Sequence, residues 1–263
     1  MSLLAIDAGN TEIALGVRAD HAWQARWRVR TSDRRTADEY RVLVRDLFEL
    51  DGVAPSAVEA VAIASVVPAV TPVLRAMSVA LFHVEPLVVG PDMKTGMPLR
   101  YEPVAHLGSD RLADAVAARA RHGSPVVVVD FGTATTFTVV DAGGTMIGGA
   151  IAPGIGVAAL SLAQSGARLR RIDLSAPPGM RVVGKNTEHS MRAGVLYGYA
   201  GLVDGMLARI DAEMHATDGT RRAPVVATGG MSTLIAPLVR RIDHVEPDLT
   251  LDGVCLLHAL NAS

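Results

Sequence analysis

Two segments of this chain carry the same pattern and lie at equivalent places in it. In each, a short apolar run ends in an aspartate, and a glycine follows two residues later: Asp7 and Gly9 in the first segment, Asp130 and Gly132 in the second. The aspartates are 123 residues apart, and twice that spacing nearly spans the 263 residues of the chain. Self-similarity at a fixed spacing is the sequence signature of a repeated structure. We therefore expect two copies of one domain.

The first copy is predicted to begin with three strands. Polar residues separate these β-like runs, and a capping-box pattern from Thr36 to Glu39 then starts a helix. The runs that follow alternate between strand and helix, which gives the order βββαβαβ. The predicted strands cover residues 3–7, 13–17, 23–30, 58–66 and 86–89, and the second predicted helix covers residues 68–81.

The second copy repeats this beginning. Its predicted strands cover residues 125–130, 136–140, 145–151 and 224–227, and helices are predicted over residues 111–121, 189–214, 232–241 and 251–260. Strands that alternate with helices indicate an α/β fold. We place the two halves at residues 1–107 and 108–263, with the boundary near residues 90–107.

One uncharged stretch, residues 142–167, imitates a membrane span. It contains seven glycines and Pro153, with two turn-like pairs at Gly143-Gly144 and Pro153-Gly154. These breaks favour a hairpin followed by a helix over one continuous apolar helix. We expect no membrane association.

The composition argues against a nucleic-acid partner. The chain has 25 Lys and Arg against 27 Asp and Glu, and its positive charges form no basic block. With 2 Trp, 4 Tyr and 4 Phe, it also has few side chains on which bases could stack.

The cysteine count and the N-terminal residues suggest a reducing compartment. Cys255 is the only cysteine, so neither an internal disulfide nor a cysteine zinc site can form. The segment that ends at Asp7 lacks the positive region and the apolar length of a signal peptide. We expect a cytoplasmic protein.

The two Asp-x-Gly turns have the composition of a phosphate site. Glycine lets an anion approach backbone N–H groups, the hydroxyls of Thr11 and Thr133 add donors, and an aspartate can hold a metal ion or its water shell. Either turn alone would be read as an ordinary tight turn, but two copies at equivalent places favour binding. If the halves face one another, the turns line a cleft that suits Mg²⁺ and a polyphosphate.

Two further segments could complete such a site. The turn at Gly229-Gly230 follows a predicted strand and opens a helix, which suits a backbone surface for a nucleoside. Asp110 and Arg111 stand side by side at the start of another predicted helix. They are either a helix cap with an exposed arginine or part of an acceptor site, and the residues alone leave this open.

Two well-known nucleotide motifs are matched only in part. Residues 179–186 fit GxxxxGK, but Asn186 stands where a P-loop has Ser or Thr, and no apolar strand precedes the segment. Residues 130–132 spell DFG without the His-Arg-Asp loop and the glycine-rich loop of a protein kinase. We reject both interpretations.

In order and spacing, five motifs resemble type III pantothenate kinase. They are DAGNT at residues 7–11, GSDR at 108–111, DFGTATT at 130–136, GKNT at 184–187 and TGG at 228–230. The segments SVVP at 65–68 and KTG at 94–96 resemble the family too. The resemblance therefore runs from the first predicted strand to the closing helix.

The resemblance implies a duplicated RNase-H-like, actin-like ATPase fold with the active site in the cleft between its halves. It implies ATP-dependent phosphorylation of pantothenate to 4′-phosphopantothenate, the first step of coenzyme A biosynthesis. The implied enzyme is a cytoplasmic homodimer with its substrate site close to the interface, and it uses Mg²⁺ with ATP and a monovalent cation, K⁺ or NH₄⁺.

The resemblance also implies residue roles. Asp110 would be the general base on the pantothenate hydroxyl, Asp130 would bind the monovalent cation, and Asp7 would hold Mg²⁺ directly or through water. With the glycine turn added, the expected ATP-binding residues are Asp7, Ala8, Gly9, Asn10, Thr11, Glu12, Ile13, Ala14, Thr133, Gly229 and Gly230. The implied pantothenate-binding residues are Tyr101, Gly108, Ser109, Asp110, Arg111 and Thr187.

Two other functions stay open. A non-catalytic, nucleotide-binding transcription regulator could use the same scaffold, but it would be expected to carry a helix-turn-helix or a basic arm. A phosphatase would position water where a kinase positions an alcohol, and the intact segment 108–111 favours a bound alcohol.

Overall fold

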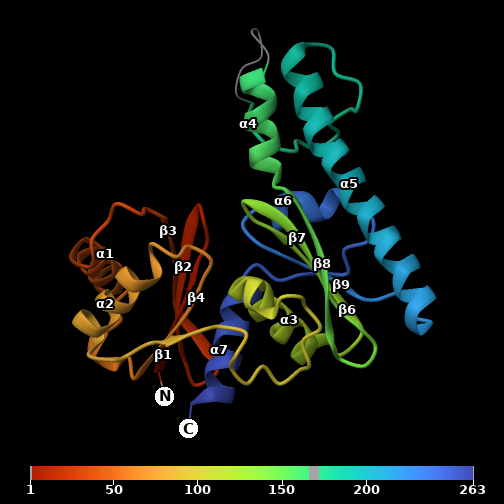
Figure 1. The fold of residues 1–263 in the computed structure, drawn as a ribbon. Coiled ribbons are helices and arrows are strands. Elements are labelled where there is room, and N and C mark those ends of the chain that lie inside the picture. Colours follow the sequence, from red (N-terminus) through yellow and green to blue (C-terminus); the bar gives the residue numbers. More distant parts are fainter. Residues whose placement is uncertain (1, 166–171, 263) are drawn as a thin grey trace. The chain divides into compact units, whose positions relative to one another are not determined.

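The computed structural model describes residues 2–165 and 172–262 of the chain (Figure 1). These residues form two compact units, Met1–Ala117 with Leu249–Ser263, and Ala118–Asp248. The units differ from the predicted halves, 1–107 and 108–263, because residues 108–117 and the closing helix pack within the first unit. The two compact units are defined by packing, which does not show where one sequence repeat ends and the next begins. The boundary between the repeats therefore stays a prediction.

The first unit is built on a five-stranded sheet with the order β3-β2-β1-β4-β5. The central strand β1 pairs with β2 in the antiparallel direction and with β4 in the parallel direction. Strand β3 extends the antiparallel side, and β5 extends the parallel side. The strands are β1 (Ser2–Ala8), β2 (Glu12–Ala19), β3 (Ala22–Arg30), β4 (Ala60–Ser65) and β5 (Leu87–Val88).

The second unit contains a sheet with the same plan. Its central strand β6 pairs with β7 in the antiparallel direction and with β9 in the parallel direction, β8 pairs antiparallel with β7, and β10 pairs parallel with β9. The strands are β6 (Val126–Phe131), β7 (Ala134–Val140), β8 (Met146–Pro153), β9 (Val225–Thr228) and β10 (His244–Val245). Order and direction match the first sheet strand for strand, which confirms the predicted duplication.

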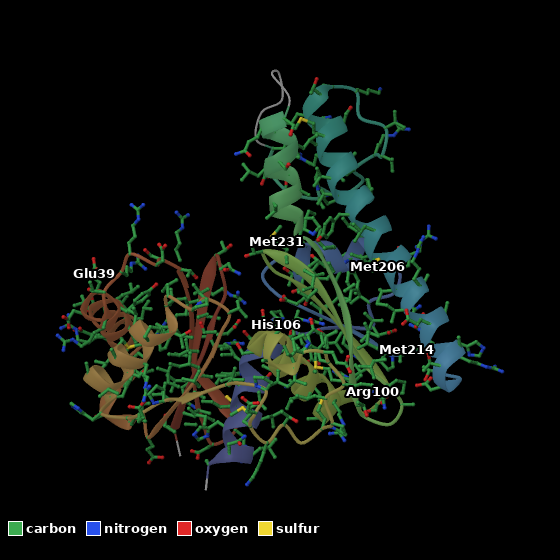
Figure 2. All side chains as sticks on the ribbon, viewed as in Figure 1. Glu39, Arg100, His106, Met206, Met214 and Met231 are labelled. Atoms are coloured by element: carbon green, nitrogen blue, oxygen red, sulfur yellow. The ribbon has the colours of Figure 1, made fainter. Side chains whose placement is uncertain are left out.

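Helices follow equivalent strands in the two units. The first unit has α1 (Ala37–Leu50), α2 (Thr71–Phe82), the first part of α3 (Ser109–His122) and α7 (Leu249–Asn261), and the second has α4 (Ile155–Ser165), α5 (Thr187–Asp218) and α6 (Ser232–Ile235). Short 3-10 turns lie at Pro55–Ala57, Val104–His106 and Ala236–Leu238. Figure 2 labels Glu39, which lies in the first turn of α1, and His106, which ends the 3-10 turn before α3.

The predicted capping box starts α1. The Thr36 hydroxyl accepts the Glu39 backbone N–H at 3.3 Å, and the Glu39 carboxylate accepts the Thr36 backbone N–H at 2.7 Å. Two of the backbone donors that a helix start leaves without intrahelical partners are thereby satisfied. The local sequence therefore fixes where the first helix begins.

In each sheet, one face carries the larger apolar core and the other carries the key aspartate. Leu4, Ile6 and Ala8 of β1 lie in the core formed with α1 and α2. Because successive strand residues point to opposite faces, Asp7 lies on the other face of the sheet. Val127, Val129 and Phe131 of β6 likewise lie in the core formed with α5, and Asp130 faces the opposite way.

Helix α7 fixes the start of α3 within the first unit. It packs against β1, β2 and β4, and Gly253 lets it approach α3 closely, since an added Cβ would lie 2.0 Å from the Ala113 carbonyl oxygen. The Thr250 hydroxyl also donates to Oδ1 of the buried Asp114 at 2.8 Å. The closing helix therefore holds the first turns of α3 against the unit that contains Asp7.

Two predicted helices have different limits in the structure. The helix predicted over residues 232–241 ends at Ile235 and continues as a 3-10 turn that contains Pro237, because proline provides no N–H for a longer helix. Strand β10 follows, and its two residues were not predicted. Helix α2 starts at Thr71 instead of near Pro68, with Pro72 in its first turn, where proline is well tolerated.

The uncharged stretch forms the expected hairpin and helix. Residues 142–165 include the β7–β8 turn, β8 and α4, while residues 166 and 167 lie outside the described part of the chain. Within the described ranges, we find no helix with both the length and the apolar character needed to cross a membrane.

Candidate active site

The first candidate phosphate turn follows the end of β1. The Gly9 N–H donates to the Glu12 carbonyl at 3.0 Å, and the Thr31 hydroxyl donates to the Gly9 carbonyl at 2.6 Å. Asn10, Thr11 and Glu12 are exposed, whereas Ala8, Ile13 and Ala14 are buried in the flanking strands. The eight expected ATP-binding residues from Asp7 to Ala14 thus form one hairpin with an exposed tip and a fixed base.

The GSDR segment forms the start of α3. An added Cβ on Gly108 would lie 2.4 Å from Oδ1 of Asp110, so a larger residue there would force the carboxylate to move. The Arg111 backbone N–H donates to the same oxygen at 2.7 Å. This arrangement fixes the Asp110 carboxylate at the N-terminal end of the helix.

Contacts within the first unit connect the GSDR segment to the end of β1. The Val66 N–H donates to the Ala8 carbonyl at 3.1 Å, directly after Asp7. The position of an added Cβ on Gly108 is 3.5 Å from Cγ1 of Val66. Asp7 and Asp110 therefore lie at the same end of the first sheet, although 103 residues separate them in the sequence.

Arg111 and Tyr101 form a second pair at this end. The Arg111 guanidinium donates from Nη1 to the Tyr101 hydroxyl at 3.1 Å and lies over the Tyr101 ring at 5.2 Å. Arg111 is 5% exposed. A guanidinium held in this way presents a positive charge suited to a carboxylate.

Burial changes the acid strength of Asp110. Desolvation raises the pKa of its carboxyl group above the ordinary aspartate value, and the hydrogen bond from the Arg111 backbone N–H opposes this rise. A raised pKa makes the carboxylate a better proton acceptor. Next to it, Ser109 is buried, and its hydroxyl has no hydrogen-bond partner among the residues that the structure describes.

In the second unit, glycines surround the Asp130 carboxylate. An added Cβ would lie 2.1 Å from Oδ1 on Gly229 and 3.4 Å from Oδ2 on Gly132. Gly229 has a φ of +88°, which favours glycine, and its carbonyl accepts the Ser232 hydroxyl at 2.7 Å. The turns after β6 and β9 therefore meet at this carboxylate.

Two threonine hydroxyls lie beside Asp130 on the same face of the sheet. Thr136 and Thr228 are its register partners on β7 and β9, and both are buried. Neither hydroxyl has a hydrogen-bond partner in the described ranges. Buried polar atoms are normally paired. The two hydroxyls therefore suit a bound ligand that hydrogen-bonds to them, or a cation that their oxygen atoms coordinate.

The structure places the remaining expected residues in the second unit. Thr133 and Gly230 are exposed, and each lies in a glycine turn next to Asp130. Thr187 is the exposed first residue of α5, after the N-cap Asn186. Within the described residues, no hydrogen bond joins Thr187 to the Asp130 turn.

Sequence reasoning did not assign roles to Thr136, Thr228 or Tyr199. Thr136 lies in the DFGTATT segment and Thr228 in the TGG segment, but only strand register shows that both pair with Asp130. Tyr199 reaches Thr135 across 64 residues of sequence. No local spacing pattern signals such a contact.

Comparison with known proteins extends these observations to the whole chain. The family model described as type III pantothenate kinase matches residues 3–209. A type III pantothenate kinase of Anaeromyxobacter sp. (strain K) is 49% identical over 259 residues, which cover 98% of this chain and 99% of the relative.

Solved structures share the fold at low sequence identity. One, described as a Baf family transcriptional activator from Campylobacter jejuni, has a TM-score of 0.58 at 17% identity and covers 97% of each chain. A polyphosphate/ATP-glucomannokinase from Arthrobacter sp. has a TM-score of 0.51 at 15% identity and covers 98% of each chain. These similarities show that the chain shares its duplicated α/β fold with these proteins. The matching family model and the full-length relative show that this chain belongs to the type III pantothenate kinase family.

Proposed function

We propose that this chain transfers the γ-phosphoryl group of ATP to pantothenate and thereby forms 4′-phosphopantothenate, the first step of coenzyme A biosynthesis. The observation that carries the proposal is the half-buried Asp110 carboxylate, with its raised pKa, at the same end of the first sheet as the Asp7 turn. Phosphoryl transfer depends mainly on positioning and charge stabilisation, with a base to accept the hydroxyl proton.

In this proposal, Asp110 accepts the proton of the pantothenate hydroxyl as that oxygen attacks the γ-phosphorus. Arg111 binds the pantothenate carboxylate, and Tyr101 holds the guanidinium in place. The buried Ser109 hydroxyl provides a hydrogen-bonding group for the substrate. Gly108 leaves room for the Asp110 carboxylate. Thr187, the exposed first residue of α5, is the remaining expected pantothenate-binding residue.

The ATP phosphates bind the backbone N–H groups and hydroxyls of the turn from Asp7 to Ala14. Asp7 holds Mg²⁺ directly or through water, and the bound ion would neutralise phosphate charge. Thr133, Gly229 and Gly230 are the expected ATP-binding residues of the second unit. Their support is the close packing of the two glycine turns around Asp130.

Asp130 binds the monovalent cation, K⁺ or NH₄⁺, in this proposal. The residues fit such an ion because a carboxylate and two buried hydroxyls, those of Thr136 and Thr228, lie on one face in register. All three groups provide oxygen atoms, which hard cations prefer.

The assignment makes a direct prediction for the wild-type protein. With ATP, Mg²⁺ and K⁺ or NH₄⁺, it should form ADP and 4′-phosphopantothenate in equal amounts, and Na⁺ in place of K⁺ should slow the reaction strongly. Coupled ADP detection with mass spectrometry of the product measures both. ATP binding without turnover would contradict the kinase and support the regulator, while phosphate release to water would support the phosphatase.

Asp110→Asn tests the proposed base. The amide has nearly the same shape but cannot accept the proton, so we expect kcat to fall about 100- to 10,000-fold. Folding raises the pKa of Asp110, so its ionised form costs stability at neutral pH and this cost disappears as the pH falls through the raised pKa. The variant should therefore melt at the wild-type temperature or above.

The matched control is Asp92→Asn, which removes an exposed carboxylate from the same unit. This variant should keep wild-type kinetics. A kcat for Asp110→Asn within tenfold of the wild-type value would rule out Asp110 as the base.

We also propose that the enzyme is a homodimer that uses an exposed glycine stripe on α5, which borders the open space between α4 and α5. Gly194, Gly198 and Gly201 recur at helical spacing, are exposed, and would each have open space around an added Cβ. Glycine in a helix interior costs about 1 kcal/mol relative to alanine, and nothing packed within the unit requires it here. A smooth helix face of this kind suits close packing against a second copy.

Sedimentation equilibrium of the full chain tests the dimer. We expect two chains per particle for the wild type and one for Gly201→Lys, because lysine favours the helix but blocks close approach of another helix. Ala216→Lys, at an exposed position near the end of α5, should remain dimeric. A monomeric wild type, or a dimeric Gly201→Lys variant, would contradict this interface.

The cytoplasmic location and the absence of nucleic-acid and membrane partners belong to the same proposal. Their support is the near-neutral charge, the small number of aromatic residues and the single cysteine. Cys255 is buried, and desolvation raises the pKa of its thiol to about 11, so the thiol is unreactive at neutral pH.

A further inference from the structure

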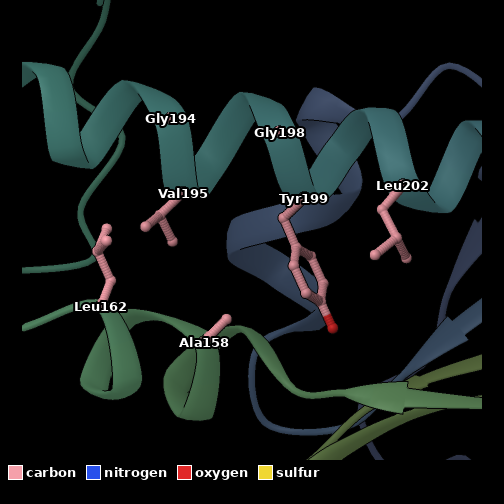
Figure 3. A pocket seen from close by; sticks show the side chains of 7 residues that line it. All are labelled: Ala158, Leu162, Gly194, Val195, Gly198, Tyr199 and Leu202. Atoms are coloured by element: carbon pink, nitrogen blue, oxygen red, sulfur yellow. The ribbon is translucent and has the colours of Figure 1, made fainter. Parts of the chain in front are cut away.

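Tyr199 links the long helix α5 to the strands that carry the second phosphate turn. Its ring projects from α5 on the side that faces α4 (Figure 3). The side chain is buried, and its hydroxyl contacts the hydroxyl of Thr135 on β7 and the Pro153 carbonyl at the end of β8. One phenol group therefore bridges three elements of the second unit.

The chemistry of the partners fixes the direction of these hydrogen bonds. The Pro153 carbonyl can only accept, so Tyr199 must donate its single proton there, at 2.8 Å. Thr135 must then donate to the Tyr199 oxygen. Burial raises the pKa of the Tyr199 phenol, which keeps the required proton in place.

The bridged strand ends enclose the turn at Gly132 and Thr133. Thr135 lies two residues after Thr133, and Pro153 is the register partner of Ala134. The next residue, Gly154, donates its N–H to the Thr133 carbonyl at 3.0 Å, and an added Cβ there would lie 2.3 Å from the same oxygen. A small displacement of Pro153 would therefore move the turn itself.

Packing alone does not hold the Tyr199 ring on its outer side. There it borders an open, largely apolar hollow of about 290 Å³ between α4 and α5. The other residues that line this hollow are Ala158, Leu162, Gly194, Val195, Gly198 and Leu202. Because side chains do not fill this space, the two hydroxyl contacts add to the core packing on the other side of the ring in fixing where its end lies.

We propose that Tyr199 is a positioning residue that sets the nucleotide turn at Gly132 and Thr133 through its bonds to Thr135 and Pro153. The inference rests on the proposed function, in which this turn binds ATP. Tyr199 itself contacts neither substrate in this account. Loss of its hydroxyl should weaken ATP binding and leave pantothenate binding and the chemical step largely unchanged.

The test compares Tyr199→Phe and Thr135→Val with the wild type. In each variant, KM for ATP should rise about five- to tenfold, the size expected for one lost hydrogen bond. KM for pantothenate and kcat should stay within about twofold. The double variant should resemble Tyr199→Phe, because that variant already removes the bond to Thr135 together with the bond to Pro153.

Tyr197→Phe is the matched control. It removes a phenol hydroxyl from the same helix, one that donates to the Met180 carbonyl at 2.6 Å, outside the turn. Its KM for ATP should remain at the wild-type value. Thermal melting of all variants separates a general loss of stability from a specific loss of ATP affinity.

Calorimetric titration with ATP makes the result independent of turnover. A wild-type protein that binds ATP but phosphorylates nothing would overturn the proposed function, and the ratio of ATP Kd values would still test Tyr199. A Kd for ATP in Tyr199→Phe and Thr135→Val within twofold of wild type, or a loss equal to that of Tyr197→Phe, would overturn the positioning role.

Discussion

The parallel pairing of the central strand in each sheet is the constraint on which the site depends. It places the carboxyl end of β1 beside the end of β4, and the carboxyl end of β6 beside the end of β9. Ligands in open α/β sheets bind at such strand ends. An aspartate at the end of the central strand therefore lies next to the turn that leads into the following helix, and this happens once in each unit.

The two copies have diverged around this shared plan. In the first unit, the neighbouring strand end leads through Val66 to the GSDR segment, which provides a carboxylate and a guanidinium. In the second, the neighbouring strand ends in Thr228 and Gly229, which bring a hydroxyl and a close backbone approach to Asp130. The same topology thus supports a proposed acceptor site and a proposed ATP phosphate turn in the first unit. In the second unit it supports a proposed monovalent-cation site next to two further turns expected to bind nucleotide.

Burial affects the pKa of the Asp110 carboxyl group more than the charge of its neighbour does. The ionised carboxylate of Asp110 loses solvation at the start of α3, and the nearby Arg111 offsets only part of that cost. A base with a raised pKa is the result. The position depends on α7, since Gly253 allows the contact that holds α3 in the first unit.

Much of the fold could be predicted from the sequence, because local sequence patterns indicate most of its strands and helices. The repeat of Asp-x-Gly turns indicated the duplication, and the Thr36 capping box marked the start of α1. Strand β10 could not be predicted, since two residues after a proline-interrupted helix give no periodicity. Thr136 and Thr228 lie in motifs that resemble the family, but their pairing with Asp130 depends on strand register, which the sequence does not show.

The candidate site was harder to predict from the sequence than the fold. Spacing alone left Asp110 and Arg111 open between a helix cap and an acceptor site, and the resemblance to a family was needed to assign their roles. No role was predicted for Tyr199, because its hydroxyl forms hydrogen bonds with residues on two other strands and no local sequence pattern indicates such contacts. The structure adds the physical reasons: desolvation at Asp110, glycine packing at Asp130 and the bridge made by Tyr199.

The pH dependence of kcat/KM for pantothenate tests the central claim most directly, because it reports the ionisation of the base in the free enzyme. The base must be ionised to accept the proton, so activity should fall as the pH drops through the Asp110 pKa. We predict a one-proton acid limb at a pKa clearly above about 3.9, the ordinary value for aspartate. An acid limb at that ordinary value, or a rate that stays constant across the range, would contradict the account.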